Sequence, residues 1–218
     1  MTVPPSERTR LRRKPARGAY DRETIDAILD EALVAHLGIA VDGQPYVIPT
    51  LHARVGDTVY LHGSAGSRTL RALASGTPAC LTVTLLDGLV LARSARHHSV
   101  NYRSVVVLGQ AVPVTDTHER LAALRTFMER IVPGRFGEVR APSEADARVT
   151  GVLSMSLAEA SAKLRTGPPL DDAQDYALDV WAGVIPLRMQ AGAPIPDPRL
   201  APDIEPSAKI ESWLRERA

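Results

Sequence analysis

The sequence predicts a mainly β protein with inserted helices, an α+β fold in which six to eight antiparallel strands close into a small barrel. The first observation is a meander, because Asp42-Gly43 and Gly56-Asp57 are tight-turn dipeptides between β-rich runs over residues 37–64. The second is a further series of β-rich runs at 79–94, 102–116, 149–157 and 180–189. Closure into a barrel is the economical way for so many antiparallel strands to hide their edges.

Composition and charge limit the classes of protein. The chain has 218 residues, of which 44% are hydrophobic, enough for one large domain with a real core. Its formal net charge is +1, so no global field favours nucleic acid or a membrane as a partner. The sequence has no apolar run of about 20 residues and no signal-peptide pattern. The single cysteine, Cys80, argues against a disulfide framework or a cysteine zinc cluster, so we expect a cytoplasmic protein.

The elements of the first half follow from local signals. Residues 1–17 are basic and contain proline, which predicts a flexible tail. Asp21 is a candidate N-cap, and the helix after it would bury Ile25, Ile28, Leu29, Ala32 and Leu33. A short helix follows Ser67 and ends at Gly76, with Pro78 just beyond it.

In the second half, Asp87-Gly88 predicts a hairpin turn, and Gly109 a bulge or bend in the next strand. Asp116 or Thr117 caps a longer helix, whose predicted buried stripe is Leu121, Leu124, Met128 and Ile131. The predicted organisation is therefore a tail at 1–17, a barrel domain at 18–190, and a proline-rich C-terminal tail at 191–218 that ends in a short helix.

One stretch carries a candidate binding site. Residues 59–76 read VYLHGSAGSRTLRALASG, a strand that passes into a helix through a loop of small residues. Backbone amides at a helix N-terminus are unpaired and partly positive. Ser64, Ser67 and Thr69 add hydroxyls and Arg68 adds a charged fork, which together suit a phosphate monoester. The alternative is that Ser67 only caps the helix and Arg68 is solvated. The pattern matches neither the P-loop nor the Rossmann fingerprint.

Four stretches carry a family resemblance: GQPYVIPTLHA, VYLHGSAGSRTLRAL, HHSVNYRSVVVLGQA and SAKLRTGPPLDDAQDYALDVWAGVIPL. From Arg17 to about Leu200, the chain resembles the pyridoxamine 5'-phosphate oxidase-like proteins, closest to the branch that includes nitroimidazole-resistance proteins. The resemblance implies a split β-barrel of the FMN-binding type. It also implies a homodimer with FMN held at the subunit interface.

The resemblance also assigns candidate residues to the cofactor. The phosphate and ribityl end of FMN would lie on residues 62–69, the isoalloxazine along 47–50 and above the strand at 81–84, and the partner subunit would supply residues 102–104 and Trp181. The implied cofactor-binding residues are Val47, Ile48, Pro49, Thr50, His62, Gly63, Ser64, Ser67, Arg68, Thr69, Leu81, Thr82, Tyr102, Arg103, Ser104 and Trp181. His62 is the candidate catalytic residue, since a histidine beside the flavin could steer a proton or the substrate.

Other side-chain groups carry weaker hypotheses. His97 and His98 are adjacent, so on a strand they point to opposite faces and no metal site is predicted. Lys163 and Arg165 would share one face of a strand, where they could bind an anion or be solvated charges, and the base rate favours solvation. Cys80 lies in an apolar strand and is expected to be an inert core thiol.

The predicted function is that of an FMN-binding flavoprotein, an oxidoreductase that acts on a small molecule through the bound flavin. The arginine-led phosphate motif of the biosynthetic oxidase has no equivalent before Thr50, and the oxidase's C-terminal arginine and histidine pattern is absent. Oxidation of pyridoxamine phosphate is therefore not expected. The alternatives are a split barrel that binds F420 or haem, and a flavin carrier or sensor without turnover.

Overall fold

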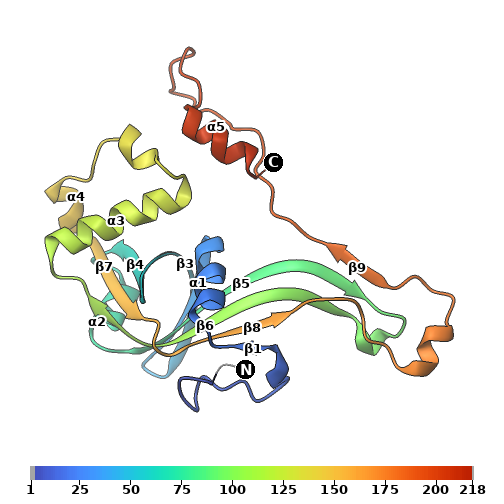
Figure 1. Ribbon diagram of the computed structural model, residues 1–218. Coiled ribbons are helices and arrows are strands. Elements are labelled where there is room, and N and C mark those ends of the chain that lie inside the picture. Colours follow the sequence, from blue (N-terminus) through green and yellow to red (C-terminus); the bar gives the residue numbers. More distant parts are fainter. Residues whose placement is uncertain (1–2, 218) are drawn as a thin grey trace.

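The centre of the fold is a closed ring of strands (Figure 1). The computed structural model describes residues 3–217. Neighbouring strands of the ring pair antiparallel in the order β6-β7-β4-β3-β2-β5, and an additional β5–β6 pairing closes it. The barrel predicted from the sequence is therefore confirmed. The ring strands are β2 (Val34–Val41), β3 (Gln44–Val55), β4 (Thr58–Ser64), β5 (Pro78–Leu91), β6 (Ser99–Pro113) and β7 (Thr150–Ser156).

Strands β5 and β6 are longer than the barrel and carry an extension away from it (Figure 1). β2 pairs with β5 along residues 79–82, and β7 pairs with β6 along 111–113. Further along, β5 pairs with β9 (Gly183–Pro186), and β6 pairs with β8 (Ala160–Arg165), which is flanked by the two-residue β1 (Gly18–Ala19). Along its length β5 thus pairs first with β2 and then with β9, and β6 pairs first with β8 and then with β7, so the sheet divides into a barrel and an extension. With these flanks, residues 3–217 contain nine strands.

The predicted hairpin about Asp87-Gly88 is wrong, because β5 runs through both residues as one strand. The register against β6 shifts between Leu86 and Gly88, so Asp87 is accommodated as a bulge. A Cβ on Gly88 would lie 3.0 Å from the carbonyl oxygen of Ile185, so the glycine lets β9 approach closely. The chain reverses later, through the short turn η2 (Ala95–His97).

The helices cover the barrel and its ends. Asp21 and Asp116 cap the first and third helices by accepting from the amides of Thr24 and Glu119, as the sequence predicts. The predicted buried stripe of the third helix is only partly right: Leu121, Leu124 and Met128 are half-buried and Ile131 is exposed, whereas the fully buried residues are Ala123 and Phe127, because the helix is rotated so that Phe127 meets His62 of the barrel. The helices are α1 (Arg22–Glu31), α2 (Arg68–Ala74), α3 (Thr117–Ile131), α4 (Glu144–Val149) and α5 (Ala208–Arg215), with 3-10 turns η1 (Pro15–Arg17), η3 (Arg135–Glu138) and η4 (Ala173–Ala177). None of the described helices is long and apolar enough to cross a membrane.

One hydrophobic core fills the ring. The apolar face of α1, formed by Ile25, Ile28 and Leu29, packs into the same cluster as the inward side chains of the strands. The terminal segments also contact the barrel domain. Ser6 and Arg8 both donate to the carboxylate of Glu159, and Lys209 of α5 donates to the carbonyl of Gly134. The strand residues at the centre of the core include Leu37, Leu61, Leu81, Val83, Val105, Val107 and Met155.

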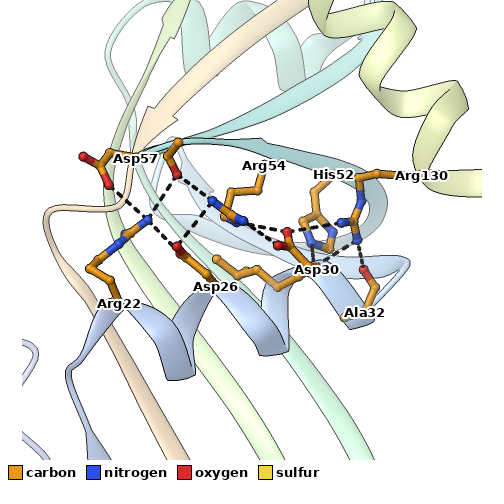
Figure 2. A network of polar contacts seen from close by, with 10 residues as sticks. Arg22, Asp26, Asp30, Ala32, His52, Arg54, Asp57 and Arg130 are labelled. Carbon is orange, nitrogen blue, oxygen red and sulfur yellow. Dashed lines mark hydrogen bonds and ion pairs between the residues drawn. The ribbon is translucent and has the colours of Figure 1, made fainter. Parts of the chain in front are cut away.

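A polar network ties the end of α1 to β3 and α3 (Figure 2). Arg54 of β3 pairs with Asp26 and Asp30 of α1. Arg130 of α3 donates to the carbonyls of Leu29 and Ala32. These carbonyls lie at the C-terminal end of α1, where the last carbonyls of a helix have no partner within the helix. His52, which is 1% exposed, contacts the Leu29 carbonyl through Nε2 at 2.9 Å. The network therefore links α1, β3 and α3 through hydrogen bonds and ion pairs.

We expect His52 to make the protein less stable in mild acid. Burial lowers the pKa of His52 from 6.5 to about 4, so the folded state holds this ring neutral. An unfolded chain binds the proton below pH 6.5, and stability therefore falls as the pH drops from 6.5 towards 4, by about 2 kcal/mol at pH 5. Urea unfolding at pH 7.5 and pH 5 measures this loss. His52→Gln should flatten the dependence, whereas the exposed His118→Gln should leave it unchanged.

Candidate functional site

The site predicted from the sequence lies where β3 and β4 part. β3 pairs with β4 only along residues 52–55, whereas its first part pairs with β2. β4 pairs with β7 along its whole length, but only its first part, residues 58–61, also pairs with β3. Two predicted cofactor segments, 47–50 on β3 and 62–69 at the end of β4, therefore stand on either side of this opening.

The loop between β4 and α2 is held by its own hydrogen bonds. The Ser67 hydroxyl accepts from the Leu70 amide at 3.1 Å, and the Ser67 amide donates to the Ser64 carbonyl at 2.9 Å. A Cβ on Gly63 would lie 3.1 Å from the Leu70 side chain, so glycine lets α2 pack close to β4. Ser67 is thus the cap of α2, as one interpretation of the sequence has it, while Ser64 remains exposed.

Arg68 reaches from α2 to β3. Its guanidinium lies over the ring of Tyr46, 4.7 Å from the centroid, in a cation–π contact. Within residues 3–217 Arg68 has no carboxylate partner, so its donors are available to an anion. Tyr46 is not among the residues predicted for the site, although it directly precedes the predicted segment at 47–50. Thr69, the next residue of α2, is half-buried.

The β3 segment shows two faces. Val47 is 70% exposed, and Pro49 lies in register with His36 of β2, which in turn pairs with Thr82 of β5. These residues form one outward row of the sheet. Ile48 and Thr50 alternate with them and are half-buried on the inner face. Leu81, predicted to lie beneath the flavin, is fully buried in the core, so its side chain is directed away from the outward row.

His62 lies between β4 and α3. Its ring is stacked at a tilt on Phe127, with centroids 4.2 Å apart. Burial lowers the pKa of His62, so the imidazole is neutral at pH 7. Among the described residues, its buried Nδ1 has no hydrogen-bond partner. The ring therefore has the state required of a proton acceptor or a metal ligand.

The residues predicted to come from a partner subunit lie on the extension, away from α2 (Figure 1). The Ser104 hydroxyl donates to the Lys163 carbonyl, and Tyr102 pairs in register with Arg165. Arg103 binds both Glu31 and Asp87, which raises its pKa and occupies its guanidinium in the monomer. Trp181 is 64% exposed beside Gly183. In one chain, these residues do not meet the loop at 62–69.

The chain matches one known protein family over most of the barrel domain. A family model described as pyridoxamine 5'-phosphate oxidase matches residues 21–164. The chain belongs to this oxidase family. Members of the family share a fold but need not share one activity. No curated protein matches the chain. In the part of the chain that the structure describes, no cluster of three or more His, Cys, Asp or Glu side chains could hold a metal ion.

Two solved structures of similar proteins cover nearly the whole oxidase-family chain. One is the flavocytochrome Anf3 from Azotobacter vinelandii, with 45% identity, a TM-score of 0.91, and coverage of 97% of this chain and 98% of that one. The other is the FAD and heme binding protein from Mycobacterium smegmatis, with 37% identity, a TM-score of 0.86, and coverage of 90% and 96%. A candidate 5-nitroimidazole antibiotic resistance protein from Bacteroides thetaiotaomicron, 23% identical with a TM-score of 0.57, covers 67% of this chain and 85% of that one and shares the fold.

Proposed function

We propose that this chain is a flavin-binding redox protein that acts as a homodimer on a small molecule. The observation that carries the proposal is the exposed guanidinium of Arg68, which has no carboxylate partner within residues 3–217 and lies beside the Ser64–Ser67 loop where β3 and β4 diverge. The similarity over nearly the whole chain to two proteins named for flavin or cytochrome cofactors supports it.

The residues at the opening fit a flavin nucleotide. Arg68 and the Ser64 hydroxyl can donate to a phosphate, and the exposed Val47 and Pro49 offer apolar surface to a flat ring. The flavin, when bound, supplies the electron-transfer chemistry, and the protein binds it, orients it and excludes water. This division explains why no pair of acid and base side chains stands out at the site.

The identity of the flavin can be decided by what co-purifies with the protein. The sequence predicts FMN, whereas the name of the Mycobacterium smegmatis protein supports FAD. Mass spectrometry of the heat-released cofactor separates FMN, FAD and F420. A colourless protein that takes up none of the three would contradict the proposal.

Haem binding is a second candidate function, because both similar structures belong to proteins named for a cytochrome or a haem. Haem iron in proteins is commonly held by a neutral histidine. Among the described residues, His52 and His62 both have a neutral ring with one unpartnered nitrogen, but His52 is 1% exposed and contacts the Leu29 carbonyl, whereas His62 is only half-buried and is therefore the better candidate. A Soret band in the purified protein that shifts in His62→Ala would assign this residue to the iron.

The exposed apolar side chains of the extension support the homodimer. Leu86 and Leu89 of β5 and Val100 of β6 are each more than a third exposed, and Trp181 is 64% exposed. An accumulation of large apolar side chains on one extension is typical of an interaction surface. A partner subunit seated there would bring its own residues 102–104 towards this flavin. Analytical ultracentrifugation tests this, and a monomer that retains its flavin would contradict it.

We expect His62→Ala to slow the redox reaction more than it destabilises the fold. A general acid or base contributes about a hundredfold in rate, whereas the half-buried His62 ring of β4 lies outside the hydrophobic clusters and its removal loses mainly the contact with Phe127. Reoxidation of the reduced flavin by an added acceptor, followed by stopped flow, measures the rate, and thermal unfolding measures stability. The exposed His118→Ala serves as the control.

A large fall in melting temperature with an unchanged rate would make His62 a core residue. A wild-type protein that binds flavin but shows no turnover with any acceptor would be a carrier or sensor.

A further inference from the structure

Arg165 is a buried cation without a counter-charge. It is 7% exposed, so the interpretation of this residue as a solvated charge is wrong. Its guanidinium donates to the side-chain oxygen of Asn101 and to the carbonyls of Gly167 and Pro168. All three acceptors are neutral. They fix the position of the guanidinium but leave its positive charge uncompensated.

Two further cations lie beside Arg165. Lys163 is two residues earlier on β8, on the same face of the strand, and it pairs with Gly18 of β1. Arg17 directly precedes β1, whose Gly18 is in register with Lys163; burial lowers the pKa of Arg165, and the charge of Arg17 lowers it further. Within residues 3–217, the side chains of Arg17 and Lys163 have no ion-pair partner, and no carboxylate is among the groups that shift Arg165.

This arrangement is unfavourable unless an anion completes it. Like charges repel, and the repulsion is least screened where one of them is buried. A buried arginine is normally compensated by a carboxylate or a phosphate, because the guanidinium fork matches both. Tyr102, in register with Arg165 on β6, adds a hydroxyl that can donate to the same group.

We propose that Arg17, Lys163 and Arg165 form a binding site for the phosphate or carboxylate group of a small ligand. The site lies on the β1–β8–β6 flank of the sheet, separate from the loop at 62–69. None of the three residues belongs to that loop; because Tyr102 beside them is one of the residues predicted to face the flavin of a partner subunit, the inference deepens the proposed function and rests on it. Three sources share the required chemistry: the phosphates of a flavin nucleotide, the propionates of a haem, and a free anionic substrate.

The test uses inorganic pyrophosphate as the probe and the protein as purified. We expect Lys163→Gln and Arg17→Gln each to weaken either pyrophosphate binding or retention of the bound cofactor by about tenfold, the effect of losing one charge-assisted hydrogen bond. Isothermal titration measures the first, and cofactor content after dialysis measures the second. Arg13→Gln is the matched control, because Arg13 is an exposed arginine of the same segment. Both test residues are outside the core, so the outcome does not depend on a variant of the buried Arg165.

The pattern of losses identifies the source. If the variants lose FAD but not FMN, the ligand group is the flavin pyrophosphate. If they lose haem, it is the haem propionates. If they lose only affinity for pyrophosphate, the ligand is a free anion. If neither variant differs from Arg13→Gln in any of these readouts, the proposal is overturned. It is also overturned if both variants only change the oligomeric state, since a carboxylate of a second copy would then neutralise the cluster. Arg68→Gln separates the two proposals, because it should release flavin phosphate at the loop and leave this site intact.

Discussion

Arg68→Gln is expected to weaken retention of the flavin nucleotide by roughly 30-fold, because a charge-assisted bond to phosphate contributes about 1.5–3 kcal/mol. The guanidinium has no carboxylate partner within residues 3–217 and lies over Tyr46, so its removal leaves no buried charge behind. Stability should therefore change little. Fluorescence of the released flavin, followed during dilution, gives the dissociation constant.

Arg71→Gln is the matched control for this prediction. Arg71 is an exposed arginine on the same helix, so the variant changes the net charge by the same amount. Equal losses in the two variants would mean that the whole surface attracts the phosphate and would remove Arg68 from the site. Ser67→Ala is less suitable, because Ser67 caps α2 and its loss destabilises the helix by about 1 kcal/mol.

Arg130→Ala is expected to lower the free energy of unfolding by about 3 kcal/mol, since it removes the donor from the Ala32 carbonyl, one of two partners from the Leu29 carbonyl, and the ion pair with Asp30. The Arg130 side chain is only 13% exposed, and it donates to two carbonyls at the end of α1 while it pairs with Asp30 (Figure 2). Removal of the guanidinium would leave the Ala32 carbonyl without this donor and the Leu29 carbonyl with only its contact to His52 Nε2. Urea unfolding at pH 7.5 measures the difference.

Arg22→Ala tests whether the position in the network determines this effect. Arg22 pairs with Asp26 and Asp57 in the same network, but its side chain is 38% exposed (Figure 2). Exposed ion pairs contribute little, so we expect a loss below about 1 kcal/mol. A loss as large as that of Arg130→Ala would show that the charges act collectively, and that capping of α1 is not the dominant contribution.

The parts of the fold that depend on neighbouring residues could be predicted from the sequence. Asp42 and Gly43 both have positive φ, as a two-residue hairpin turn requires, and the caps at Asp21, Ser67 and Asp116 act on amides three residues away. Asp87-Gly88 carries the same turn signal but lies within β5. There the pairing with β6 and β9 on both sides overrides the local preference.

In the candidate site, too, the features that depend on neighbouring residues could be predicted and those that depend on distant residues could not. The loop at 62–69 is continuous in sequence, so its hydroxyls and its arginine could be recognised together. The contact of Arg68 with Tyr46 joins α2 to β3, and the cluster of Arg17 with Arg165 joins η1 to β8, so both bring together elements that are distant in the sequence. No local pattern predicts such contacts, because they depend on which strands become neighbours when the barrel closes.

The flanks of the extension come from opposite ends of the chain, and this has a consequence for synthesis. Gly18 of β1 meets Lys163 of β8, and Leu91 of β5 meets Gly183 of β9. Pairings between such distant residues form slowly, because a long loop must close first. A nascent chain that has left the ribosome only as far as α3 therefore displays the outer edges of β5 and β6 uncovered. During that interval, those edges are the natural target of chaperones and the point at which two immature chains would associate wrongly.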